Sequence, residues 1–348
     1  MASRLLTLLP LGLVCCVPAD DQLPASRPPL PAPPEGTVGG FGIDLPPFVL
    51  QPGEERLPCY VFPLDIQGPS RVVAAGSLTT GPGLHHGNIT TRRKTGEGFR
   101  LCEPRPGDHV GFDILEGGAV LFASSTQVVG VEWQSFPAGM GFRVRDGFEI
   151  VARMHYVNAT PAALTIAPRY RWYTIAEDAL RQEVGPFAWS YSRFRIPPRS
   201  LHTVTAECRF DRAMYIVHAL PHMHALGRRF VASFLGGPRD GRPFLDVDYG
   251  LRGESDMLLY DPAVDVTQGG AGDGVRFSCT WHNTFDKEIT EGVGDNEMCI
   301  LFGYAYPPQH AYSVLATDVG GCVAVLPPTP RGEMNKPGRA AAQGAGGF

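Results

Sequence analysis

Short runs of alternating apolar and polar residues recur along the chain, and Gly and Pro cluster between them. The runs are rich in Val, Ile, Phe and Tyr, the pattern typical of β-strands joined by turns. In the first half, strands are predicted at 59–63, 110–114, 120–133, 141–144, 148–157 and 164–175. In the second half, they are predicted at 188–196, 202–210, 213–224, 229–235, 244–249, 275–283, 296–306 and 312–317.

This pattern predicts an all-β protein made of two β-sandwich domains side by side, at 53–178 and 179–326, with the boundary between residues 175 and 185. No short repeat is visible, but the two halves have similar length and strand density. Residues 20–52 are rich in proline and are predicted to form a flexible linker. Residues 327–348 are rich in Pro, Gly and Ala and are predicted to be a disordered tail.

Composition supports this fold class and narrows the function. The 348 residues suffice for one large or two ordinary β-domains, and 42 Gly and 33 Pro favour many turns over long helices. The net charge of -5, without a basic patch, argues against a nucleic-acid binder. Oligomeric state is left open by the sequence.

The N-terminus has the features of an export signal. Arg4 precedes a short apolar stretch at 5–14, so residues 1–19 are predicted to be a signal peptide. Leu13 stands three residues before Cys16, so a lipoprotein signal with a lipid on Cys16 is an alternative to simple secretion, although Cys15 is an unusual residue before such a site. We therefore expect a periplasmic, extracellular or outer-membrane lipid-anchored protein whose only membrane contact would be that lipid.

Six further cysteines remain after the signal, an even number that suggests disulfides in an exported chain. Spacing alone does not determine their connectivity. Our working hypothesis pairs Cys59 with Cys102, Cys279 with Cys299, and Cys208 with Cys322.

The first candidate for chemistry is the pair His222 and His224, at the end of an apolar run. Alternate residues of a strand share a face, so the two Cα atoms would lie about 6.5–7 Å apart with both imidazoles on one side. Such a pair is either a metal site or a structural or surface pair. His218 shares that face if the strand is regular, as a group behind the site or as a buried structural histidine, although a proline such as Pro221 can interrupt the alternation.

Three more candidates lie elsewhere. His85 and His86 are adjacent, so on a regular strand they would face opposite ways, and both could bind one ion only if the backbone bends. His155 alternates with the apolar residues of 148–156 and should point away from its own core, toward a metal or simply toward solvent. Met298 should face opposite to Cys299, as a core residue or as a soft thioether ligand that suits cuprous copper.

Taken together, these motifs resemble the copper type II, ascorbate-dependent monooxygenases, the family of peptidylglycine α-hydroxylating monooxygenase and dopamine β-monooxygenase. The resemblance covers about residues 59–322. Order, spacing and cysteine context agree across four motifs: His85-His86, Met154-His155-Tyr156, His222-Met223-His224-Ala225-Leu226-Gly227 and Glu297-Met298-Cys299.

The resemblance implies two jelly-roll-like domains with one copper ion each. An electron-transfer copper would be bound by His85, His86 and His155, and a catalytic copper, where O2 and substrate meet, by His222, His224 and Met298. Ascorbate would be the reductant, and one oxygen atom of O2 would enter a C–H bond of a small-molecule substrate.

Departures from the family pattern bear on the substrate. Residues that hold the substrate carboxylate in peptidylglycine enzymes are replaced here by Leu220, Ile300 and Phe302. An apolar or aromatic substrate is therefore expected. Gly87 follows the His pair where animal enzymes carry Met, a change of packing. The alternative hypothesis is an exported copper-binding or surface-interaction protein on the same scaffold, without turnover.

Overall fold

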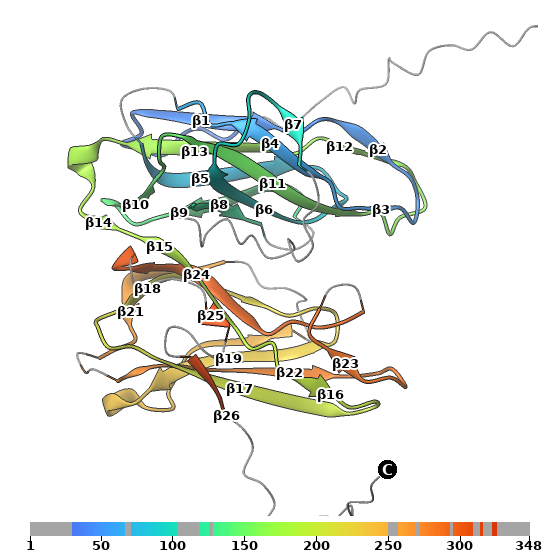
Figure 1. Ribbon diagram of the computed structural model, residues 1–348, viewed down its shortest axis with the longest axis vertical. Coiled ribbons are helices and arrows are strands. Elements are labelled where there is room, and N and C mark those ends of the chain that lie inside the picture. Colours follow the sequence, from blue (N-terminus) through green and yellow to red (C-terminus); the bar gives the residue numbers. More distant parts are fainter. Residues whose placement is uncertain are drawn as a thin grey trace, which may run out of the picture. The chain divides into compact units, whose positions relative to one another are not determined.

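The computed structural model describes residues 30–66, 71–102, 118–124, 128–249, 257–268, 270, 272–292, 295–308, 314–315 and 322–325. The chain divides into two compact units, Met1–Glu183 and Val184–Phe348, so the division lies inside the interval that the sequence predicts. Both units are built from β-strands, as predicted (Figure 1). The predicted signal peptide with Cys15 and Cys16, the predicted tail and the predicted strand at 110–114 lie outside the described residues.

The first unit contains two facing sheets and one small ribbon. One sheet has the order β1-β13-β5-β10-β14 with β9 also paired to β5, and the other has the order β7-β4-β11-β6-β8 with β3 paired to β11. A two-stranded ribbon joins β2 to β12. The strands are β1 (Gly39–Asp44), β2 (Phe48–Leu50), β3 (Glu55–Arg56), β4 (Cys59–Pro63), β5 (Val72–Thr80), β6 (Leu84–Arg93), β7 (Arg100–Leu101), β8 (Val120–Ala123), β9 (Gly130–Ser135), β10 (Met140–Arg143), β11 (Phe148–Val157), β12 (Leu164–Ile166), β13 (Arg169–Ile175) and β14 (Gln182–Glu183).

The second unit repeats this plan. Its sheets have the orders β21-β18-β24-β15-β25 and β20-β19-β22-β17-β26, with a ribbon of β16 and β23. The strands are β15 (Gly185–Ser190), β16 (Arg195–Ile196), β17 (Leu201–Arg209), β18 (Tyr215–His222), β19 (Gly227–Leu235), β20 (Pro243–Asp248), β21 (Leu258–Asp265), β22 (Gly274–His282), β23 (Ile289–Thr290), β24 (Ile300–Tyr306), β25 (Val314–Leu315) and β26 (Cys322–Val325).

The two units have the same strand order. The series β1-β13-β5-β9 corresponds to β15-β24-β18-β21, and the series β4-β11-β6-β8 corresponds to β17-β22-β19-β20. Each unit is thus an eight-stranded jelly roll with a few short additional strands, which confirms the expected fold class. The small ribbons β2-β12 and β16-β23 also correspond, although the sequence shows no repeat.

A buried asparagine marks the same turn in both units. Asn158 follows β11 and Asn283 follows β22, and each is 0% exposed. In each case the side-chain amide donates to the carbonyl oxygen four residues later, Ala162 or Lys287, while the side-chain oxygen accepts a backbone N–H two residues later. The turn is therefore fixed by the same four-residue arrangement, and the Nδ2 atom of Asn158 in its N-x-T sequon is fully used.

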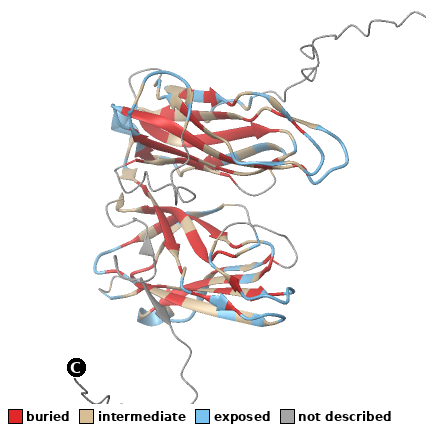
Figure 2. Ribbon diagram, turned by 45° about the vertical axis from the view of Figure 1, so that its right-hand side comes forward, coloured by how far each residue is buried: buried red, intermediate tan, exposed pale blue. Residues whose placement is uncertain are grey.

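Each sandwich has its own core, shown as buried ribbon in Figure 2. In the second unit, the main cluster joins both sheets and includes Trp189, Phe230, Phe277 and Trp281. A disulfide between Cys279 and Cys299 lies within this core. Among the described residues, no helix has the length and apolar character needed to cross a membrane.

The predicted linker at 20–52 is wrong over its last part. β1 and β2 fall within it, and four of its residues are buried: Phe41, Ile43, Leu45 and Leu50. β1 pairs with β13 along its whole length, so this segment belongs to the first sandwich. The strand was missed because glycines interrupt its apolar pattern. Glycine is needed at position 40, since a Cβ there would clash with the carbonyl oxygen of Trp172 across the pair.

Several other strands were missing from the sequence prediction. β5 is buried on both faces for most of its length, so it shows no alternation. β6 carries a polar run that ends in two arginines, and β21, β23 and β26 were also not predicted. The predicted strand at 120–133 spans β8 and part of β9, and the predicted strand at 164–175 spans β12 and β13.

Candidate metal centres

The first candidate centre lies where β6 begins and β11 ends. Along these antiparallel strands His86 lies opposite His155, but the next pair joins Tyr156 to Leu84, which leaves His85 as an extra residue. This is a β-bulge, in which two residues of one strand oppose one residue of its partner. The bulge provides the backbone bend that the sequence required for His85 and His86 to share one ion.

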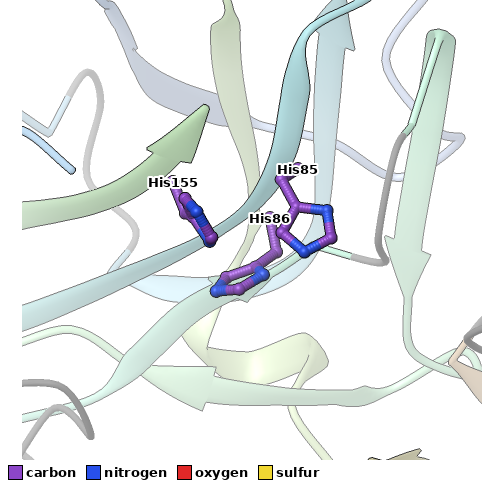
Figure 3. Close-up of side chains that lie close together, drawn as sticks. All are labelled: His85, His86 and His155. Atoms are coloured by element: carbon purple, nitrogen blue, oxygen red, sulfur yellow. The ribbon is translucent and has the colours of Figure 1, made fainter. Parts of the chain in front are cut away.

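The three imidazoles meet on one side of the sheet (Figure 3). Ring centroids lie 5.0 Å apart for His85 and His86, 4.8 Å for His85 and His155, and 4.9 Å for His86 and His155. One nitrogen from each ring lies within 4.8 Å of the others. Nitrogens that share an ion at zinc-like bond lengths of about 2.0–2.1 Å are at most ~4.2 Å apart, so small rotations would complete the site.

The residues around the bulge explain its shape. Gly83 has φ +101°, a left-handed conformation that suits glycine, and turns the chain into β6. Gly87 has no room for a side chain, because a Cβ there would lie 2.5 Å from Cε of Met154. Ser124 further accepts a hydrogen bond from the Gly87 N–H and donates one to its carbonyl oxygen. The close packing of Met154 and Tyr170 therefore accounts for the glycine at position 87.

The alternation in β11 confirms the predicted direction of His155. Met154 and Tyr156 are buried at 3% and 0% exposure, whereas the His155 side chain is 18% exposed. Glu149 lies six residues before His155 and so on the same face of β11, but it is 1% exposed because Arg92 and Arg100 cover it with ion pairs of 2.9 and 2.6 Å.

A carboxylate that sequence reasoning missed also contacts this centre. Glu55 of β3 lies opposite Val157, two residues beyond His155 on the same face of the sheet. Its Oε1 lies 2.6 Å from Nε2 of His155. The two residues are 100 positions apart in the chain, so no local pattern indicates this contact.

The second unit has the same bulge without the histidines. There Thr280 lies opposite Arg229, Trp281 lies opposite Gly227, and Arg228 is the extra residue. Counted from Asn158 and Asn283, the positions of His155, His85 and His86 are occupied by Thr280, Arg228 and Arg229. The bulge is therefore a feature of the fold, and the three imidazoles are a property of the first unit.

The second candidate centre lies at the end of β18. His222 and His224 have ring centroids 5.1 Å apart, so the structure brings the predicted pair together. The pairing of β18 with β24 is regular from His218 to His222, so Pro221 does not interrupt the alternation. His218 is 3% exposed and lies edge-on to Tyr304 at 5.8 Å. Four residues of strand separate its Cα from that of His222 by about 13 Å, so any effect on that ring passes through an intervening group.

Two groups to which the sequence prediction assigned no role, Asn296 and Glu297, hold His224 in place. Its Nδ1 donates to the carbonyl oxygen of Asn296 at 2.7 Å, which leaves Nε2 as the lone-pair atom. The carboxylate of Glu297, 0% exposed, accepts the N–H groups of His224 and Leu226, both at 2.7 Å, and the indole N–H of Trp281 at 2.9 Å. Burial raises the pKa of Glu297, and the donated N–H groups oppose that rise.

Met298 and Cys299 face opposite ways, as predicted. Cys299 lies in the main core and is bonded to Cys279, whereas Met298 packs in a separate cluster with Ala188 and Ile300. Ile300 lies opposite His222, and Met298 belongs to the same small cluster as Ile300. The disulfide thus fixes the segment that carries the thioether.

The three candidate substrate residues share the face of His222. Leu220 lies opposite Phe302, and Ile300 lies opposite His222. The Phe302 ring lies 5.9 Å from the His222 ring and packs against the cluster of Met298 and Ile300. All three are apolar, and none of them could hold a carboxylate group.

Two of the predicted disulfides are present. Cys59 and Cys102 are joined with their Cα atoms 5.2 Å apart, and Cys279 and Cys299 with theirs 5.8 Å apart. Cys208 is also disulfide-bonded, and the register of β17 and β26 places it opposite Cys322. That register is compatible with the third predicted pair.

The donor sets fit copper. Neutral imidazole is a good ligand for both copper oxidation states, and a thioether favours the cuprous ion. The first centre offers three imidazoles, and the fixed tautomer of His224 offers a free Nε2 in the second. The Asn296 carbonyl group is the kind of partner that orients metal-bound histidines.

Comparisons with known proteins add little to this geometry. No family model and no curated protein matches the chain. The major capsid protein P2 of bacteriophage PM2 is 11% identical, with a TM-score of 0.30 over 76% of this chain and 97% of the phage chain. The infectious bursal disease virus VP2 subviral particle is 13% identical, with a TM-score of 0.19 over 80% and 74% of the two chains. Scores this low support no inference about function.

Proposed function

We propose that the chain is an exported, ascorbate-dependent dicopper monooxygenase related to the copper type II family. In this proposal His85, His86 and His155 bind the electron-transfer copper, and His222, His224 and Met298 bind the catalytic copper. The observation that carries it is the convergence of His85, His86 and His155 from two strands, which the family resemblance requires.

Bound copper would supply one-electron redox chemistry and a binding position for O2. The residues of the two centres would suit copper in different oxidation states. The three imidazoles of the first centre suit an ion that cycles between oxidation states, whereas the thioether of Met298 favours the reduced ion. The Asn296 carbonyl group and the Glu297 carboxylate orient His224, so its Nε2 is available without rearrangement.

The substrate in this proposal is a small apolar or aromatic molecule. Leu220, Ile300 and Phe302 lie on the face of His222 and present only apolar groups beside it. They would bind a hydrocarbon or aromatic body next to the site of C–H cleavage, and an anionic end group would find no partner among them.

The test is copper loading followed by oxygen consumption. The full chain is purified, loaded with Cu(II), and mixed with ascorbate and a panel of alkyl and aryl compounds in an oxygen electrode. Two copper ions per chain, with substrate-dependent oxygen uptake and a hydroxylated product, are expected. Met298→Ala should lose product formation but keep the first copper.

A control variant changes a methionine away from both centres. Met140 of β10 pairs with Gln182 and is not part of either candidate centre, so Met140→Ala should leave both copper ions and turnover intact. Binding of no more than one copper ion, or no substrate-dependent oxygen uptake with any compound, would contradict the monooxygenase. Two tightly bound ions without turnover would instead support a copper-binding protein.

A further inference from the structure

The contact between Glu55 and His155 has a consequence for how the first centre binds its ion. A carboxylate accepts hydrogen bonds, so at 2.6 Å the Nε2–H of His155 is the donor and Oε1 of Glu55 is the acceptor. The proton on Nε2 removes that atom as a ligand. The lone pair of His155 is then on Nδ1.

The position of Glu55 indicates that it contacts His155 and is not itself a ligand of the ion. Its carboxylate oxygens do not join the group of ligand atoms that lie within 4.8 Å of one another, although one of them touches the His155 ring. A carboxylate on the ion side of the ring would lie among the other ligands. Glu55 thus contacts His155 without being a fourth member of the group that the three imidazoles form.

The second unit offers an internal comparison. Glu55 lies opposite Val157, and the corresponding pair in the second unit is Leu201 and His282. The unit that has the bulge but lacks the three imidazoles therefore also lacks the carboxylate. Glu55 accompanies the histidines and is not required by the fold.

We propose that Glu55 is a positioning residue of the three-histidine centre: it holds His155 through Nε2–H so that Nδ1 faces the ion. A carboxylate in this role fixes the tautomer and raises the basicity of the ligating nitrogen. The inference rests on the proposed copper site. It adds a residue that the family resemblance does not supply.

The first test needs no metal. Nitrogen NMR of the imidazoles in the metal-free full chain distinguishes a protonated Nε2 from an unprotonated one. A protonated Nε2 in His155 is expected, and Glu55→Ala should change its signal. An unprotonated Nε2 in the unmodified chain would overturn the role of Glu55 and leave the proposed function standing.

The second test measures copper at the first centre alone, in a His224→Ala background that weakens the second centre. Glu55→Ala should lower Cu(II) affinity on the order of tenfold. Glu55→Gln keeps an acceptor and should lose less. Pulsed EPR should show a changed coupling to the remote nitrogen of a bound imidazole in Glu55→Ala.

The matched control is Glu97→Gln, since Glu97 is exposed, paired with Lys94, and outside the centre. Equal affinity and equal remote-nitrogen coupling in Glu55→Ala and Glu97→Gln would overturn the proposal. Loss of a directly bound oxygen in Glu55→Ala would also overturn it, because Glu55 would then be a ligand. A first centre that binds no copper in the unmodified chain would instead contradict the proposed function itself.

Discussion

Replacing Glu297 tests how the second centre is held together. Its carboxylate is 0% exposed and accepts three N–H groups, from His224, Leu226 and Trp281. A hydrogen bond to a charged group contributes about 1.5–3 kcal/mol. Removing the carboxylate leaves three buried N–H donors unsatisfied, and each unsatisfied donor costs about 1–3 kcal/mol. Glu297→Ala should therefore lower the free energy of unfolding of the second unit by about 3 kcal/mol or more.

Glu297→Gln should have a smaller effect. Oε2 accepts two of the three bonds, so the amide oxygen should take that position and the NH2 group would face the N–H of Leu226. The variant loses one hydrogen bond and brings two donors together, so its free energy of unfolding should fall by about 1–3 kcal/mol. Urea denaturation, followed by tryptophan fluorescence, measures the stability. Hydrogen exchange of the Leu226 amide reports the local contact.

The same variants should weaken copper binding at the second centre, because His224 would lose a backbone anchor. Glu288→Gln is the control, since Glu288 pairs with Arg195 on the surface of the same unit, with its side chain 44% exposed. If Glu297→Ala has the same free energy of unfolding as the control and the same exchange rate at the Leu226 amide, the hydrogen bonds to Glu297 contribute nothing to stability.

Three further predictions concern the sandwiches themselves. Burial raises the pKa of Glu149, but hydrogen bonds from Arg100, Arg92 and Thr95 outweigh this and hold it below its ordinary value. The contribution of the Glu149 carboxylate to the free energy of unfolding should therefore be complete above about pH 5 and should be lost as the pH falls below that value. Glu149→Gln should flatten that part of the curve of stability against pH. Breaking the disulfides with Cys→Ala pairs should cost about 4 kcal/mol for Cys59–Cys102 and about 3 kcal/mol for Cys279–Cys299 on loop entropy, measured by urea denaturation. Mass spectrometry of chain secreted from a glycosylating host should find Asn158 unmodified, because its Nδ2 is bonded to two carbonyl oxygens; a glycan there would contradict the buried turn.

Much of the fold could be predicted because one face of most strands is buried. In β11 and at Met298-Cys299, alternation alone gave the correct direction of each side chain. The same rule failed for β5, where both faces are buried, and for β1, where glycines replace the apolar residues.

The details of the centres depend on pairs of strands, and a single sequence does not show them. The bulge at His85 exists only relative to His155 on the neighbouring strand. Glu55 and Glu297 act across 100 and 73 residues of chain, respectively, so only the register brings them to His155 and His224. Sequence spacing could predict which histidines come together, whereas the tautomers of His155 and His224 and the carboxylates that contact them could be found only from the structure.

The measurement that tests the central claim most directly is X-ray absorption at the copper edge of the reduced, copper-loaded chain. Two copper ions per chain are predicted, with imidazole nitrogens at both and one sulfur neighbour for every two ions. Met298→Ala should remove the sulfur contribution and leave the nitrogen contribution of His85, His86 and His155. A single ion, or two ions without sulfur in the unmodified chain, would contradict the pairing of an all-histidine centre with a thioether centre.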